Sequence, residues 1–343
     1  MIQENAFPHN NQEVCVCRFP QELSRVLPRS HQKRINHSLV NRCSIRSSCE
    51  QELVPLDGSY NSKNTNKNYS MKDYWDSLLE FCHQTTKVVG DRLLQDFGNI
   101  QAVKKADGSL VTKADQWADG AIREAIAKTF PEHGVLTEET THIFPANDWC
   151  WIIDPIDGTT NFTRGVPIWG ISLGLLYRGT PVFGFVYIPC LQEAFYGYLP
   201  GSSGLEMPIG AYMNGNSIKT TSDIPSKSHL FNFCARSLAI LKKPFPCKVR
   251  MIGVASYNLL LVAAGAVIGG VEATPKIWDI AAVWVIVQAA GGAFIHLDEQ
   301  DPFPLTINKD YGQASFPTLA LAREELTTTF KPLASVILER NTK

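Results

Sequence analysis

Residues 151–162, which read Trp-Ile-Ile-Asp-Pro-Ile-Asp-Gly-Thr-Thr-Asn-Phe, constrain the fold more than any other stretch of the chain. Bulky β-forming residues lead directly into Asp154 and Asp157, which predicts a buried strand that ends in two carboxylates. An ionised carboxylate without a partner is very costly in a low-dielectric interior, and the next cationic residue downstream is Arg164. We therefore expect a metal ion, and oxygen ligands favour Mg²⁺, Mn²⁺ or Ca²⁺ over zinc.

The residues around this acidic pair favour a tight arrangement of the backbone. Pro155 fixes φ and has no N–H group, so the chain is expected to turn sharply and direct both carboxylates to one point. Gly158 then permits a ligand to approach the backbone closely.

Two further acidic segments lie elsewhere in the chain. Asp279 precedes apolar residues at helical spacing, and the pattern ends at Gly291 and Gly292, so Asp279 taken alone is interpreted as a helix N-cap. Glu138 and Glu139 stand upstream of the aspartate pair, and taken alone they are interpreted as part of a solvated loop.

Taken together, the three segments resemble the inositol monophosphatase family of metal-dependent, lithium-sensitive sugar phosphatases. The resemblance covers roughly residues 74–320 and rests on D-P-I-D-G-T-T-N-F, the upstream Glu-Glu pair, and W-D-I-A-A followed by A-G-G. It implies a layered αβαβα sandwich of α+β or α/β class. It also implies hydrolysis of a small phosphate ester by metal-activated water, without a phosphoenzyme.

The resemblance implies two to three Mg²⁺ ions held by Asp115, Glu138, Asp154, the Ile156 carbonyl, Asp157 and Asp279. The first, tighter ion matches Glu138, Asp154 and Ile156, and the weakest matches Asp115. Within the catalytic set Asp115, Glu138 and Thr159, the hydroxyl of Thr159 and the carboxylate of Asp115 align the attacking water.

Substrate contacts are implied for Asp157, Gly158, Thr159, Ala255 and Glu272. Glu272 is expected to accept hydrogen bonds from substrate hydroxyls. The chain departs from the family pattern at Val254, where Ser or Thr is usual, and at Lys276, a basic residue near the expected substrate entrance. A basic side chain there favours a second phosphate group or a more acidic substrate.

Composition is consistent with a soluble enzyme. The 343 residues carry 32 Lys plus Arg against 33 Asp plus Glu, so we expect neither nucleic acid nor an anionic membrane as a partner. Nine cysteines without a C-x-x-C motif favour reduced thiols and a cytoplasmic location. Two long uncharged stretches, residues 251–271 and 280–297, are interpreted as buried helices and strands rather than membrane spans.

Three regions are predicted along the chain. Residues 1–70 are rich in polar residues and are expected to be a disordered extension, either a targeting segment or residues that are not translated. Residues 71–200 are expected to form an α+β lobe with helices at 72–96 and 112–130 and strands at 168–177, 181–187 and 193–199. Residues 201–343 are expected to form an α/β lobe that completes the active site.

Several functions remain open at this point. Inositol 1-phosphate is the leading substrate, and fructose 1,6-bisphosphate, histidinol phosphate and 3′-phosphoadenosine phosphates are alternatives within the family. A phosphatase or ATPase with an aspartate nucleophile is disfavoured, because it needs a second Asp two residues after the first or a D-K-T-G motif. A non-catalytic binding protein is the third hypothesis. Relatives are commonly homodimers, so a homodimer is also expected.

Overall fold

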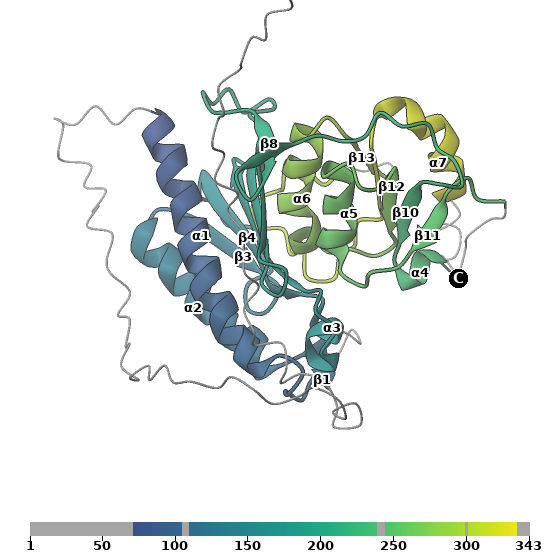
Figure 1. The fold of residues 1–343 in the computed structure, drawn as a ribbon. Coiled ribbons are helices and arrows are strands. Elements are labelled where there is room, and N and C mark those ends of the chain that lie inside the picture. The colour runs from purple at the N-terminus through teal and green to yellow at the C-terminus, as the bar shows by residue number, and fades with distance from the viewer. Residues whose placement is uncertain (1–70, 105–109, 239–243, 299–300, 335–343) are drawn as a thin grey trace, which may run out of the picture. The chain divides into compact units, whose positions relative to one another are not determined.

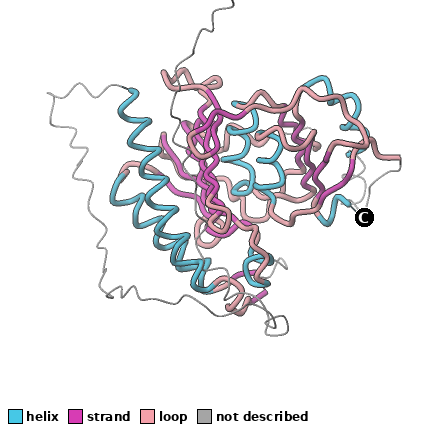
Figure 2. Tube along the Cα trace, viewed as in Figure 1, coloured by secondary structure: helices cyan, strands magenta, loops and turns pink. Residues whose placement is uncertain are grey.

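The computed structural model describes residues 71–104, 110–238, 244–298 and 301–334. The predicted disordered extension, residues 1–70, lies outside the described residues. The described helices and strands form five successive layers: helices, a seven-stranded sheet, helices, a five-stranded sheet and helices. Figure 2 shows the two sheets as magenta segments with helices on their faces. The predicted αβαβα sandwich is confirmed.

The first layer consists of α1 (Met71–Asp96) and α2 (Lys113–Thr129), joined through the short strands β1 (Val103–Lys104) and β2 (Leu110–Val111). Both predicted helices are present, with ends within one residue of the predicted bounds. In α1 the apolar residues Trp75, Leu78, Cys82 and Leu93 recur at helical spacing and are almost fully buried. These helices pack on one face of the larger sheet, where aromatic side chains fill the interface.

The seven-stranded sheet has the strands in the order β3 (Gly134–Thr137), β4 (Trp149–Asp157), β5 (Gly170–Tyr177), β6 (Thr180–Ile188), β7 (Glu193–Tyr198), β8 (Gly210–Met213) and β9 (Asn216–Ile218). Only β3 and β4 are parallel, and the predicted antiparallel meander is β5–β6–β7. Asn214 and Gly215 both have positive φ in the β8–β9 hairpin, as an Asn-Gly turn requires. The sheet therefore extends beyond the predicted lobe boundary at residue 200, because β8 returns along β7.

Helix α6 (Ile277–Ala289) lies between the two sheets and is apolar around its circumference, as a helix with two buried faces must be. It packs over a row of glycines, Gly174, Gly184 and Gly197, that are directly paired across β5, β6 and β7. A Cβ on Gly174 would lie 3.0 Å from the Cβ of Ala281, and one on Gly184 would clash with the backbone carbonyl of Ala282. The glycine row thus sets how closely α6 approaches the sheet.

The five-stranded sheet has the order β11 (Lys248–Arg250), β10 (Leu230–Phe233), β12 (Gly269–Glu272), β14 (Thr318–Leu321) and β13 (Ala293–His296). Helix α5 (Ala255–Ala263) packs beside α6 on its inner face, and α4 (Ala235–Leu238) and α7 (Thr327–Ala334) contact its strands. The helices α3 (Thr159–Arg164) and η3 (Glu324–Leu326) complete the described elements.

No described helix has the length and apolar character needed to cross a membrane. The two long uncharged stretches instead form α5, β12 and α6 with β13, as predicted. Among the described residues the five cysteines, Cys82, Cys150, Cys190, Cys234 and Cys247, are all free.

Candidate metal centre and phosphate site

A bulge in β4 brings the two aspartates of the first motif to the same side of the strand. Asp154 pairs with Ser172 of β5 and Asp157 pairs with Gly170, so three steps along β4 match two along β5. Side chains three residues apart point to opposite faces of a regular strand, and one extra residue restores them to the same face. Pro155 lies in this bulge, where its missing N–H group costs the sheet nothing.

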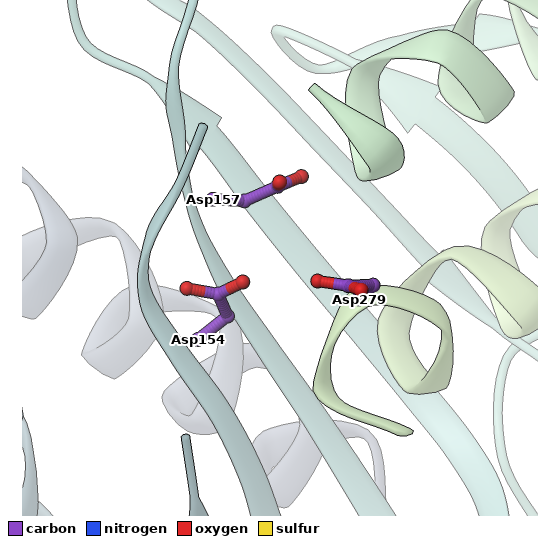
Figure 3. A group of neighbouring side chains, drawn as sticks. All are labelled: Asp154, Asp157 and Asp279. Carbon is purple, nitrogen blue, oxygen red and sulfur yellow. The ribbon is translucent and has the colours of Figure 1, made fainter. Parts of the chain in front are cut away.

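Asp279 joins this pair from the first turn of α6. One carboxylate oxygen from each of Asp154, Asp157 and Asp279 lies within 4.8 Å of the others (Figure 3). Asp154 and Asp157 are buried, and Asp279 is half-buried. Within the described residues no lysine or arginine forms an ion pair with any of the three. Three convergent carboxylates without a cationic side chain could supply oxygen ligands to a hard divalent cation.

Burial and mutual repulsion raise the pKa values of these carboxyl groups. Burial, followed by the charges of Glu138, Asp157 and Asp279, raises the pKa of Asp154 well above its usual range. Burial and the charge of Asp157 likewise raise the pKa of Asp279. A bound divalent cation would reverse these shifts, because it stabilises the ionised form of each ligand.

Asp157 also caps a helix of the neighbouring layer. Its Oδ1 accepts the Ala255 N–H at 3.3 Å and its Oδ2 accepts the Ser256 N–H at 2.7 Å. Val254, the N-cap residue of α5, has no side-chain oxygen to fill this role. Asp157 therefore supplies the N-cap acceptor that Val254 lacks, and the first N–H groups of α5 hold that carboxylate in place. The predicted substrate contact Ala255 lies here, with its N–H already donated to Asp157.

The interpretation of Asp279 as an N-cap is wrong by three residues. Lys276 is the N-cap of α6, and Asp279 is the third helical residue, whose Oδ2 accepts the Lys276 N–H at 2.6 Å. The apolar residues Ile277 and Trp278 belong to the helix as well, which the spacing after Asp279 alone did not reveal. The carboxylate therefore stabilises the helix N-terminus while it faces β4.

The predicted pair Asp115 and Thr159 meets although 44 residues separate them. The Thr159 hydroxyl is 3.2 Å from both the Asp115 Oδ1 and the Ile156 carbonyl, and it donates to these acceptors. The other Asp115 oxygen accepts the N–H and the hydroxyl of Thr112. Thr112 was not predicted as part of the site, although Thr-x-x-Asp is a capping-box pattern readable from the sequence. Burial raises the pKa of Asp115.

The other predicted residues surround this centre. Glu138 is half-buried at the end of β3, and its charge acts on both Asp154 and Asp279. The Ile156 N–H donates to Asp154 Oδ1 at 3.0 Å. Gly158 has φ of +93°, and a Cβ there would lie 2.7 Å from a Val254 methyl group, so only glycine fits this turn.

Glu272 is the last residue of β12, and the charge of Asp157 acts on it. It is 6% exposed, and burial raises its pKa to about 7. Its Oε1 accepts a short hydrogen bond from Asn258 Nδ2, a partner that the sequence analysis did not identify. The Lys276 ammonium donates to the Gly312 carbonyl at 3.0 Å.

The chain is similar to known proteins in sequence and in fold. Residues 75–331 match the model of the inositol monophosphatase family. Fructose-1,6-bisphosphatase/inositol-1-monophosphatase of Aquifex aeolicus is 34% identical over 61% of this chain and 82% of its own length. Inositol-1-monophosphatase of Synechocystis is 33% identical over 62% and 77%, respectively. The structure of the Thermotoga maritima inositol monophosphatase superimposes with a TM-score of 0.65 at 26% identity, covering 77% of this chain and 99% of that one.

The fold and the match over residues 75–331 define a phosphatase, a hydrolase of phosphate esters, and the three convergent aspartates form a group that could hold a metal ion. The chain belongs to the inositol monophosphatase family.

Proposed function

We propose that the protein is a Mg²⁺-dependent phosphomonoesterase of small polyol or sugar phosphates, with inositol 1-phosphate as the leading substrate. The observation that carries this proposal is the convergence of Asp154, Asp157 and Asp279 without a cationic partner among the described residues. Two to three Mg²⁺ ions held by these residues, Glu138, the Ile156 carbonyl and Asp115 would neutralise the phosphate and lower the pKa of a bound water.

Thr159 and Asp115 are proposed to align the attacking water. The Thr159 hydroxyl directs its hydrogen toward Asp115 and the Ile156 carbonyl, which leaves an oxygen lone pair to accept a hydrogen bond from water. The N–H groups of Gly158 and Thr159, at the left-handed turn before α3, are proposed to hold phosphate oxygens.

Glu272 is proposed to accept hydrogen bonds from hydroxyl groups of the substrate. The Lys276 ammonium donates one of its three N–H groups to the Gly312 carbonyl, so its other donors stay available to a second phosphate group of a bisphosphate substrate. One relative is named fructose-1,6-bisphosphatase/inositol-1-monophosphatase, so fructose 1,6-bisphosphate is the competing substrate. We also propose a cytoplasmic homodimer that lithium inhibits.

The test is phosphate release from a panel of esters, with Mg²⁺ and with EDTA. The panel holds inositol 1-phosphate, fructose 1,6-bisphosphate, histidinol phosphate and 3′-phosphoadenosine 5′-phosphate. Asp154→Asn is compared with Asp148→Asn, a control at an exposed aspartate that pairs with Arg178 shortly before β4. Mg²⁺-dependent release that is fastest for inositol 1-phosphate and is lost only in Asp154→Asn supports the proposal. Release that persists in EDTA, or in Asp154→Asn, contradicts it.

A further inference from the structure

The Glu272 carboxylate is held by neutral groups in the part of the chain that the structure describes. Asn258 Nδ2 donates to it, and a hydrogen bond from the Cys234 side chain lowers its pKa against the larger effect of burial. Described lysine and arginine side chains make no ion pair with it. A carboxylate held this way keeps lone pairs for further donors, since two carboxylate oxygens offer about four acceptor sites.

The side chain of Asn258 contributes little to the stability of the fold. It is 1% exposed on α5, and its Oδ1 has no hydrogen-bond partner among the described residues. The Asn232 side chain bonds the backbone carbonyl of Asn258, not its amide group. An unpaired buried polar atom destabilises a fold, so an apolar residue of similar size would suit packing better. The one contact that explains an asparagine here is the hydrogen bond to Glu272.

Cys234 is a second neighbour of the same carboxylate. Its sulfur accepts the N–H groups of Ala273 and Ser237, each at 3.3 Å, which fixes the thiol beside the end of β12. Burial, followed by the charge of Glu272, raises the pKa of Cys234. The group is therefore a protonated thiol and a poor nucleophile at neutral pH, and its one hydrogen can be donated to Glu272 or to the Ser237 hydroxyl, whose oxygen lies 2.8 Å from the sulfur.

We propose that Asn258 and Cys234 are positioning residues that hold Glu272 as an acceptor for substrate hydroxyl groups, and so select polyol phosphates over esters that lack such hydroxyls. This inference rests on the proposed phosphatase function. The preference for polyol phosphates would then depend on two uncharged hydrogen-bond donors, Asn258 from α5 and Cys234 from the segment after β10.

The experiment compares two substrates, inositol 1-phosphate and p-nitrophenyl phosphate, which has no polyol hydroxyls. Asn258→Leu and Cys234→Ala are expected to lower kcat/KM for inositol 1-phosphate, mainly through KM, by about 10- to 100-fold and about 3- to 10-fold respectively, as for hydrogen bonds to a charged group. Turnover of p-nitrophenyl phosphate should stay within about twofold, because the metal ligands are unchanged. Cys234→Ser, which retains a donor, should restore the inositol phosphate reaction, and Cys247→Ala is the matched control at a buried cysteine in the core.

A double-mutant cycle with Glu272→Gln separates positioning from a general structural role. If Asn258 acts through Glu272, then Asn258→Leu has little further effect on inositol 1-phosphate when Glu272 is already Gln. Equal losses on both substrates, or additive losses in the double variant, would overturn the inference. Failure of the proposed function is distinguishable, because the wild-type protein would then show no Mg²⁺-dependent turnover of either ester.

Discussion

Glu272 imposes a stability penalty that should depend on pH. Its pKa in the folded protein is about 7, against an ordinary value of 4.5, because the carboxyl group is buried. The folded state therefore binds this proton more tightly than the unfolded state does. Stability from this group is fully present below pH 4.5 and is lost as pH rises toward 7. Glu272→Gln removes the titration while preserving the shape of the side chain.

The magnitude follows from the pKa difference. A shift from 4.5 to about 7 corresponds to about 3 kcal/mol, at about 1.4 kcal/mol for each pKa unit. Glu272 is only 6% exposed, so solvent screening does not reduce this figure much. For a domain of this size, about 3 kcal/mol corresponds to about 6–12 °C in Tm.

The assay is thermal unfolding of wild-type and Glu272→Gln protein in EDTA at pH values from 4 to 8. We expect similar Tm values near pH 4 and a variant that is more stable by about 6–12 °C at pH 8. The same buried aspartates remain in both proteins, so most of their titration cancels in the difference, and the part that remains is the repulsion between Glu272 and Asp157. Parallel Tm curves across this range would refute the reasoning, because they would show that Glu272 ionises as easily in the fold as in the unfolded chain.

Three further predictions concern the metal site and its support. Asp154→Asn and Asp279→Asn should each lower turnover by more than about 100-fold without loss of fold by circular dichroism, since each removes a metal ligand; near-normal rates in either variant contradict the ligand assignment. Thr159→Ala should lower kcat by about 100-fold with a smaller change in KM, because water alignment matters mainly in the transition state; a change confined to KM would argue for a binding role instead. Gly184→Ala should destabilise the protein by about 1–3 kcal/mol and weaken Mg²⁺ binding measured by calorimetry, because the added methyl group pushes α6 away from the sheet. Gly120→Ala is the control, because open space surrounds Gly120, and it should have neither effect. Equal effects of the two substitutions would contradict the role assigned to the glycine row.

The elements around the site were predictable where the signal was local. The strand that carries Asp154, the helices α1 and α2, and the meander β5–β6–β7 each follow from short-range periodicity and turn residues. The Asn214-Gly215 hairpin is likewise set by two adjacent residues. The resemblance, not the spacing, indicated that Asp279 belongs with Asp154.

The remaining features depend on contacts between distant segments. A spacing of three residues does not show that Asp154 and Asp157 share a face, because the bulge is defined only by pairing with β5. Asp279 reaches the pair because α6 lies over three glycines from three different strands. The bonds from Asn258 to Glu272 and from α5 to Asp157 join residues that no periodicity relates.

The most direct test of the account is the anomalous scattering of Mn²⁺ in crystals of the wild-type protein soaked with that ion. The account predicts an anomalous peak within ligand distance, about 2.0–2.6 Å, of carboxylate oxygens of Asp154, Asp157 and Asp279. Mn²⁺ bound only at other positions, with these three carboxylates free of metal, would contradict it.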